Sequence, residues 1–143
     1  VINALPLEYE GNVKIGDEVI VQHNIFRDYF DMKGITRKSS FHFKDNLFFV
    51  PEELIYLIIR NGKYISVDDY CFIEPIFKEE RWIGKTEIEH QGIVKYSNER
   101  LNAIGIFEGD KIAFENDGEI EFIINDERLY KMRSSMILAK VYV

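Results

Sequence analysis

One sequence pattern occurs twice in this chain, and it constrains the fold more than any other feature. Val13–Val21 and Ile106–Phe114 both place a Gly-Asp pair before an apolar strand-like run, and Gly16 and Gly109 are 93 residues apart. In a repeated architecture, each repeat is one supersecondary unit with its own apolar face. The chain is therefore predicted to contain the same small fold twice.

A second correspondence shows that the two copies differ in length. Residues Asn46–Val50 resemble Arg128–Met132, with Leu47 matching Leu129. The offset between these leucines is smaller than the offset between the two glycines, and the difference predicts an insertion of 11 residues in the first copy, between Val21 and Leu47. We expect the insertion near residues 27–40, a polar stretch that has the features of an irregular loop.

The beginning of the first copy also differs from that of the second. The offset between the two glycines aligns Val1 with Val94, which lies inside the predicted strand Gly92–Tyr96. On this alignment the first copy lacks the counterparts of the strand Tyr70–Ile76 and of the loop after it. A missing strand leaves an unpaired sheet edge, which proteins normally cover or pair. We therefore expect residues upstream of Val1, or a neighbouring chain, to complete the first copy.

The apolar residues favour β-structure throughout the chain. They occur in short runs of strand length, aromatic residues make up 14% of the chain, and few segments keep a helical period. Turn-forming pairs separate the runs at Asn61-Gly62, Asp117-Gly118 and Asn125-Asp126. We predict an all-β chain with two domains, residues 1–65 and residues 66–143.

Charge and cysteine content exclude several classes of protein. The net charge is −7, which disfavours the phosphate contacts that drive nucleic-acid binding. The longest apolar run, Leu54–Ile59, is far too short to cross a bilayer. Cys71 is the one cysteine, so no internal disulfide can form, and Val1–Tyr9 lacks the features of a secretory signal. We therefore expect a cytoplasmic protein that binds neither nucleic acid nor membranes.

The sequence contains no recognisable catalytic or metal-binding pattern. His23, His42 and His90 lack the spacing of a zinc site, and Cys71 lies in an apolar strand without a paired base. No phosphate-binding glycine motif is present. The two Gly-Asp pairs are interpreted as turns, in which glycine accepts a positive φ and aspartate caps nearby amides. The chain is not expected to be an enzyme, and neither a metal nor a cofactor is expected.

The second copy resembles the GroES family of co-chaperonins along most of its length. The order of elements matches that family: a strand, a loop, a Gly-x-Val strand, a Gly-Asp turn and a closing strand that ends in Ile-Leu-Ala. The stretches that carry the resemblance are Val67–Ile76, Gly92–Val94, Gly105–Phe114 and Tyr130–Ala139. The resemblance implies two GroES-like, partially open β-barrels in tandem, the first without its opening strand and mobile loop.

The resemblance also implies a function. Co-chaperonins form rings that cap the cavity of a chaperonin, and they bind it through a flexible loop with a short apolar tip. In this chain that loop would be Phe77–Gln91, with the docking residues Arg81, Trp82, Ile83 and Gly84 at its centre. Aromatic and aliphatic anchors of this kind dominate many interfaces. The alternative is that Trp82 and Ile83 pack against the barrel itself.

Ring assembly would make the protein a homo-oligomer with a GroEL-like chaperonin ring as its partner. The closing strand Met136–Val143 is expected to pair with the opening strand of an adjacent barrel. The residues predicted for this interface are Tyr70, Phe72, Ile137, Ala139 and Val141.

Two other functions remain open at this point. The main rival is a structural β-barrel module, such as a phage virion or assembly protein, that has lost chaperonin binding. A small-ligand barrel is weaker, because no convergent set of polar residues is seen. The basic stretch Met32–Lys38 in the insertion is interpreted either as a surface loop or as a contact for a partner's acidic surface.

Overall fold

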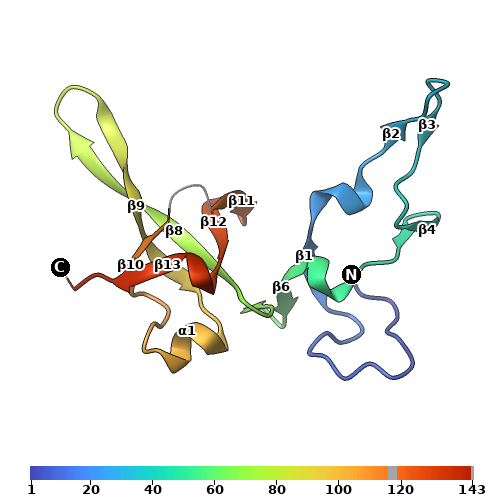
Figure 1. Ribbon diagram of the computed structural model, residues 1–143, viewed down its shortest axis with the longest axis horizontal. Coiled ribbons are helices and arrows are strands. Elements are labelled where there is room, and N and C mark those ends of the chain that lie inside the picture. The colour runs from blue at the N-terminus through green and yellow to red at the C-terminus, as the bar shows by residue number, and fades with distance from the viewer. Residues whose placement is uncertain (116–118, 143) are drawn as a thin grey trace. The chain divides into compact units, whose positions relative to one another are not determined.

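The computed structural model describes residues 1–115 and 119–142, and it confirms the all-β prediction (Figure 1). The chain divides into two compact units, Val1–Lys63 (unit 1) and Tyr64–Val143 (unit 2). Within the described ranges, no helix has the length and apolar character needed to span a membrane. The predicted turn at Asp117-Gly118 lies outside the described residues.

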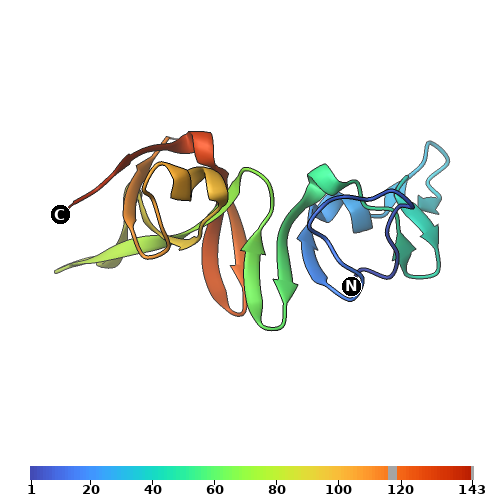
Figure 2. The same ribbon diagram turned by 90° about the horizontal axis from the view of Figure 1, so that it is seen from below.

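Unit 2 is built on a six-stranded antiparallel sheet with the strand order β11-β12-β8-β9-β10-β13 (Figures 1 and 2). Its strands are β8 (Tyr70–Glu80), β9 (Gly84–Tyr96), β10 (Lys111–Phe114), β11 (Ile120–Ile124), β12 (Glu127–Arg133) and β13 (Ile137–Lys140). The unit also has a short helix, α1 (Glu99–Ala103), and a 3-10 turn, η3 (Ser134–Met136). In the part of the chain that the structure describes, β11 and β13 are the sheet edges, so the sheet is not a closed barrel.

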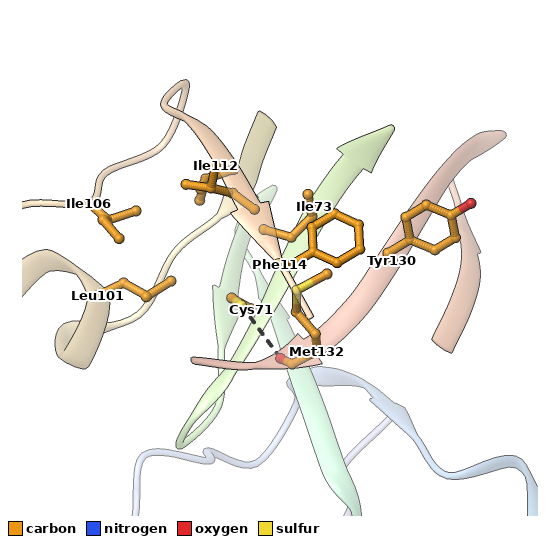
Figure 3. Packing of buried hydrophobic residues seen from close by; sticks show 9 residues of the cluster. Cys71, Ile73, Leu101, Ile106, Ile112, Phe114, Tyr130 and Met132 are labelled. Carbon is orange, nitrogen blue, oxygen red and sulfur yellow. Dashed lines mark hydrogen bonds between the residues drawn. The ribbon is translucent and has the colours of Figure 1, made fainter. Parts of the chain in front are cut away.

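One apolar cluster forms the core of unit 2, and Figure 3 shows most of its side chains converging. The cluster consists of Cys71, Ile73, Val94, Leu101, Ile106, Ile112, Phe114, Tyr130 and Met132. Alternate residues of β8, β10 and β12 supply most of it, as expected where one sheet face is buried. Cys71 is fully buried, and burial raises the pKa of its thiol to about 12. A thiol with so high a pKa is unreactive at neutral pH.

Unit 1 contains smaller sheets. Its principal pair is β1 (Glu18–Val21) with β6 (Ile55–Arg60), and β7 (Lys63–Ser66) begins at the last residue of the unit. The sequence between β1 and β6 forms two hairpins and two 3-10 turns. The hairpins are β2 (Tyr29–Phe30) with β3 (Thr36–Arg37) and β4 (His42–Lys44) with β5 (Leu47–Phe48), and the turns are η1 (His23–Phe26) and η2 (Glu52–Leu54). The interpretation of residues 27–40 as an irregular loop is therefore wrong, because the β2–β3 hairpin lies inside this segment.

The two units share a turn with the same hydrogen bonds. Asp17 Oδ2 accepts a hydrogen bond from the Lys14 N–H at 2.7 Å, and Asp110 Oδ2 accepts one from the Phe107 N–H at 2.8 Å. The glycine before each aspartate has a positive φ, 91° in unit 1 and 90° in unit 2. Both Gly-Asp pairs are thus the capped turns that the sequence predicts.

The strands after these turns also correspond. The β1–β6 ladder shifts register between Ile20 and Val21, and the β10–β13 ladder shifts between Ala113 and Phe114, which are the matching positions. The 3-10 turn η2 precedes β6, and η3 precedes β13. The sequence offset that aligns Leu47 with Leu129 also aligns these two turns. Each unit therefore contains the same turn, strand, bulge and closing strand.

The alignment at the start of unit 1 needs a correction of one residue. The Ile2 N–H donates to the Asp17 carbonyl at 2.8 Å, and the Val94 N–H donates to the Asp110 carbonyl at 2.9 Å. Ile2, and not Val1, is thus the counterpart of Val94. The prediction is off by one because the connection from this residue to the Gly-Asp turn is one residue shorter in unit 1.

Candidate docking hairpin

The segment that the sequence analysis interprets as a flexible loop is a paired β-hairpin. β8 and β9 continue beyond the sheet of unit 2 as an antiparallel ladder that projects from it (Figures 1 and 2). The register pairs Phe77 with Glu87, Lys78 with Thr86, Glu79 with Lys85 and Glu80 with Gly84. The expectation of an unpaired loop over Phe77–Gln91 is wrong, because residues 77–80 pair with residues 84–87 in a ladder. We call residues 77–87 the docking arm.

The turn of the docking arm has a form that its glycine dictates. Three residues, Arg81, Trp82 and Ile83, connect the paired Glu80 and Gly84, and the Ile83 N–H donates to the Glu80 carbonyl at 3.3 Å. Gly84 has a φ of 86°, the left-handed conformation that closes three-residue hairpin loops. A Cβ there would meet no atom within 4 Å, so the backbone angle, and not space, requires glycine.

Two large apolar side chains lie in solvent at the tip of the arm. Trp82 is 90% exposed and Ile83 is 75% exposed. The guanidinium of Arg81 lies over the indole ring, 5.8 Å from its centroid, which is cation–π distance. The structure therefore brings three of the predicted docking residues together at the turn, with Gly84 beside them, and packs neither apolar side chain against the body of the unit.

Acidic and basic side chains occur together along the arm and next to its tip. Lys78 Nζ lies 2.8 Å from Glu80 Oε1, and this hydrogen bond raises the pKa of Lys78. Within residues 1–115 and 119–142, neither Arg81 nor Lys85 makes an ion pair. The apolar tip is therefore flanked by the cations Arg81 and Lys85 and by the carboxylates Glu79 and Glu80, with Glu79 directly opposite Lys85 in the ladder.

A polar network fixes the base of the arm to β12. Tyr130 donates its hydroxyl to Glu87 Oε1 at 2.7 Å, and Arg128 donates to the Tyr130 oxygen at 2.6 Å. Arg128 also lies 3.1 Å from both Glu87 and Glu121. Burial raises the pKa of Tyr130 to about 12, and the hydrogen bond to Glu87 adds to this effect. The network joins β9, β11 and β12 where the arm leaves the sheet.

A large bulge separates the arm from the rest of the sheet. Pro75 pairs with Gly92 and Phe77 pairs with Glu87, so four residues of β9 lie opposite Ile76 alone. One of these four, His90, has a left-handed φ of 58°. A β-bulge bends its strand and re-aims the residues beyond it. The bulge thus allows the arm to point in a different direction from the strands of the sheet.

Gly92, the glycine of the Gly-x-Val strand, lies at the inner end of this bulge. An added Cβ would lie 2.3 Å from Ile73 Cγ2 and 2.9 Å from the Glu74 carbonyl oxygen. The close approach of the two strands therefore requires a residue without a side chain.

The residues predicted for an oligomer interface fall into two groups. Ile137 and Ala139 lie on β13, which forms an edge of the described sheet, and Val141 comes just after it. Tyr70 and Phe72 lie on β8, between β12 and β9, and are only 7% and 0% exposed. Their strand has no unpaired edge in the described residues, so neither residue is at an accessible surface. The opening-strand half of the predicted interface is wrong for this reason.

Clusters of metal-binding side chains and surface concavities are the other features of the described residues to compare with the arm. The described residues contain no group of three or more His, Cys, Asp or Glu side chains placed to hold a metal ion. A concavity of about 440 Å³ lies at the arm and is lined by Glu79, Glu80, Arg81, Gly84 and Lys85. Its charged lining differs from the mostly apolar walls of ligand pockets. The docking arm is therefore the strongest candidate functional site.

No protein-family model matches this chain, and a search of curated proteins finds no significant match.

Proposed function

We propose that this chain is a non-enzymatic, co-chaperonin-like lid that docks on a chaperonin ring through the arm at residues 77–87. The observation that carries the proposal is the exposed pair Trp82 and Ile83 at the end of a projecting hairpin. Large contiguous apolar patches on a protein surface often mark interaction sites, and an indole beside an isoleucine at a projecting tip can form the centre of such a patch. The repeated unit and its GroES-like order of elements support a lid.

The proposed mechanism is insertion of the apolar tip into an apolar groove of the chaperonin. Burying one large apolar side chain contributes about 1.5–3 kcal/mol, so a single arm binds weakly. Several arms on one ring would bind together with much higher avidity. Because the arm is already paired as a ladder, less conformational entropy is lost on docking than with an unstructured loop.

Ring formation belongs to the same proposal. β13 presents one unpaired edge in the described sheet, and this edge supports the proposal that Ile137, Ala139 and Val141 belong to an interface with a neighbouring chain. Backbone pairing along such an edge satisfies groups that water would otherwise solvate. We propose a homo-oligomer assembled through this strand.

The test compares tip variants with a matched surface variant of unit 2. We expect Trp82→Ala and Ile83→Ala each to lower affinity for a purified GroEL ring about tenfold or more, since about 1.4 kcal/mol corresponds to a factor of ten. Phe107→Ala removes a similar exposed side chain away from the arm and should bind as wild type. Co-sedimentation and the GroEL ATPase rate are the measurements. A wild-type chain that neither binds nor changes the ATPase rate refutes the lid.

A structural β-module, such as a phage virion or assembly protein, is the second candidate. The observation that favours it is the continuous pairing of the arm, because a permanently ordered hairpin also suits a fixed contact in an assembly. The two functions separate in one experiment. A structural module would form its oligomer and leave the GroEL ATPase unchanged, whereas a lid changes the ATPase.

A further inference from the structure

The insertion in unit 1 forms a second hairpin with an exposed apolar tip. Tyr29 pairs with Arg37 and Phe30 pairs with Thr36, and the turn between them spans residues 31–35. Phe30 and Met32 are largely or fully exposed, and Ile35 is about half exposed. In Figure 1 the hairpin, labelled β2 and β3, extends away from the β1–β6 pair of its own unit. We call residues 29–37 the insertion hairpin.

Asp31 holds the tip of the insertion hairpin in one conformation. Its Oδ1 accepts hydrogen bonds from the Lys33 N–H at 2.8 Å and the Ile35 N–H at 3.0 Å. Its Oδ2 accepts one from Arg37 Nε at 3.1 Å. Asp31 also donates its own backbone N–H to the Ile35 carbonyl, at 3.0 Å. The apolar side chains are thus presented on a pre-formed turn, which lowers the entropy lost on binding.

The tip of the insertion hairpin and the tip of the docking arm share their chemistry. Each combines exposed apolar side chains with a glycine of positive φ, 74° for Gly34 and 86° for Gly84. Each also carries cations. Arg37 and Lys38 are paired with aspartates, but Arg27 and Lys33 make no ion pair in the described part of the chain. Two unrelated segments therefore present the same combination of groups.

The local charge points to an acidic partner surface. Residues 27–38 contain four basic and two acidic side chains, in a chain whose net charge is −7. A positive patch on an acidic protein is complementary to a negative surface and directs the encounter with it. The apolar tip requires an apolar pocket at the same place. The partner surface that is complementary to the insertion hairpin is therefore an apolar pocket with carboxylates at its rim.

We propose that the insertion hairpin is a second docking element, which binds an apolar, carboxylate-rimmed pocket on the same chaperonin ring as the docking arm. The inference rests on the proposed function and goes beyond it, because it assigns an interaction to unit 1. A ring partner repeats each pocket around its axis, so one chain has equivalent sites for two similar tips. Linking two docking elements in one chain raises the overall affinity without any further contact.

The first test removes two of the three exposed apolar side chains of the tip, Met32 and Ile35. A chain carrying Met32→Ser and Ile35→Ser should bind purified GroEL at least about tenfold more weakly, because the avidity of the second element is lost. Leu7→Ser, which removes a fully exposed leucine of the same unit, is the matched control and should bind as wild type. Lys33→Glu should also weaken binding and reduce its sensitivity to salt, since screening acts on this charge. Circular dichroism and thermal unfolding check that the variants are folded.

The second test keeps the apolar tip largely intact. Its measurement is a change in fluorescence, so it does not depend on a variant that binds more weakly. Met32→Cys is labelled with an environment-sensitive fluorophore, which spares Cys71 because that thiol is fully buried. Adding GroEL should shift the emission of this label to the blue and leave a label at Leu7→Cys unchanged. Unchanged emission at position 32 refutes the proposal, even if the double variant is misfolded.

The outcomes distinguish the two proposals. If the double variant binds GroEL as wild type while Trp82→Ala does not, the insertion hairpin is not a docking element and the lid function stands. If both variants bind weakly and their controls bind normally, both proposals are supported. If the wild-type chain does not bind GroEL at all, both are refuted, because the inference assigns the hairpin to that ring.

Discussion

At the scale of single residues, each Gly-Asp turn is held by a cation from the closing strand of its unit. Arg60 donates to both oxygens of Asp17, at 2.8 and 2.6 Å, and Lys140 Nζ lies 2.9 Å from Asp110. Each cation also donates to the carbonyl five residues before its aspartate. The offset of the closing strands matches Arg60 with Tyr142, so Arg60 and Lys140 are not equivalent positions. They lie two residues apart on the matching strands, which places them on the same strand face.

The Asp17 ion pair predicts a specific acid sensitivity. The hydrogen bond from Arg60 is the main reason that the pKa of Asp17 is lowered from 3.8 to about 2. A folded-state pKa below the unfolded value contributes stability above pH 3.8, and this stability is lost as the pH falls from 3.8 to 2. Asp17→Asn should therefore lower the melting temperature at pH 7 and flatten its pH dependence in that range.

Thermal unfolding between pH 2 and pH 7 measures the effect. Asp110→Asn is the matched variant in unit 2, and it should cost less, because Lys140 makes one contact with Asp110 where Arg60 makes two with Asp17. An Asp17→Asn chain as stable as wild type at pH 7 would contradict the prediction.

At the scale of elements, the docking arm depends on its turn and on the network at its base. The ladder from Phe77 to Glu87 has no apolar core of its own, so its order comes from backbone pairing and from these two ends. At the outer end Gly84 allows the left-handed turn, and at the base Tyr130 and Arg128 hold Glu87. Changes at either end should loosen the arm and leave the sheet of unit 2 folded.

Replacing the turn glycine tests the outer end. Gly84→Ala should destabilise the arm by roughly 1–2 kcal/mol, because a residue with a Cβ is strained at positive φ. Gly84→Asn should cost less, since asparagine tolerates this conformation better. Hydrogen exchange of the amides of residues 77–87, followed by mass spectrometry, measures the loss. Equal protection in wild type and in Gly84→Ala would show that the turn does not depend on glycine.

Removing the Tyr130 hydroxyl tests the base. Tyr130→Phe should cost about 1.5–3 kcal/mol, the usual value for hydrogen bonds to charged groups, because the hydroxyl donates to Glu87 and accepts from Arg128. The pKa of Tyr130 is raised from 10.0 to about 12, so its contribution to stability is present below pH 10 and is lost as the pH rises through 12. Urea unfolding at pH 7 measures the first effect. A tyrosinate difference spectrum, wild type minus variant, should show a transition near pH 12, and a transition near pH 10 would contradict the assignment.

At the scale of the whole molecule, the chain consists of two units that repeat one arrangement. The described chain carries the docking arm in unit 2 and the insertion hairpin in unit 1, and both hairpins end in exposed apolar tips. The shared part ends in a closing strand, β6 in unit 1 and β13 in unit 2. In the described sheet of unit 2 this strand is an edge, which makes assembly through β13 a property to test on the complete chain.

A charge on β13 should block assembly through this edge. Leu138 is well exposed on β13, and lysine on an edge strand is a common means of preventing strand pairing. We expect Leu138→Lys to shift the oligomer to smaller species at equal protein concentration, as measured by sedimentation velocity. Ile123→Lys places the same charge on β11, the other described edge, and should leave the assembly unchanged. Identical sedimentation of wild type and Leu138→Lys would exclude β13 as the interface.

Local patterns in the sequence were sufficient to predict the all-β class and the repeated turn. They were sufficient because each depends on residues close together in the chain: Gly16 and Gly109 supply positive φ angles, and the aspartates next to them cap amides three residues away. Trp82 and Ile83, which the structure exposes at the turn, stand out in the sequence for the same reason, as an apolar pair in a charged stretch.

Only the tertiary structure decided how these segments pair. A charged stretch such as residues 77–87 is compatible with a loop or a ladder, and the register with its partner strand makes it a ladder. The same applies to Phe72, whose strand lies inside the sheet, and to Glu87, whose partners Arg128 and Tyr130 are more than forty residues away. The periodicity of one strand shows which side chains share a face, but the choice of neighbouring strand is a non-local contact that no short pattern encodes.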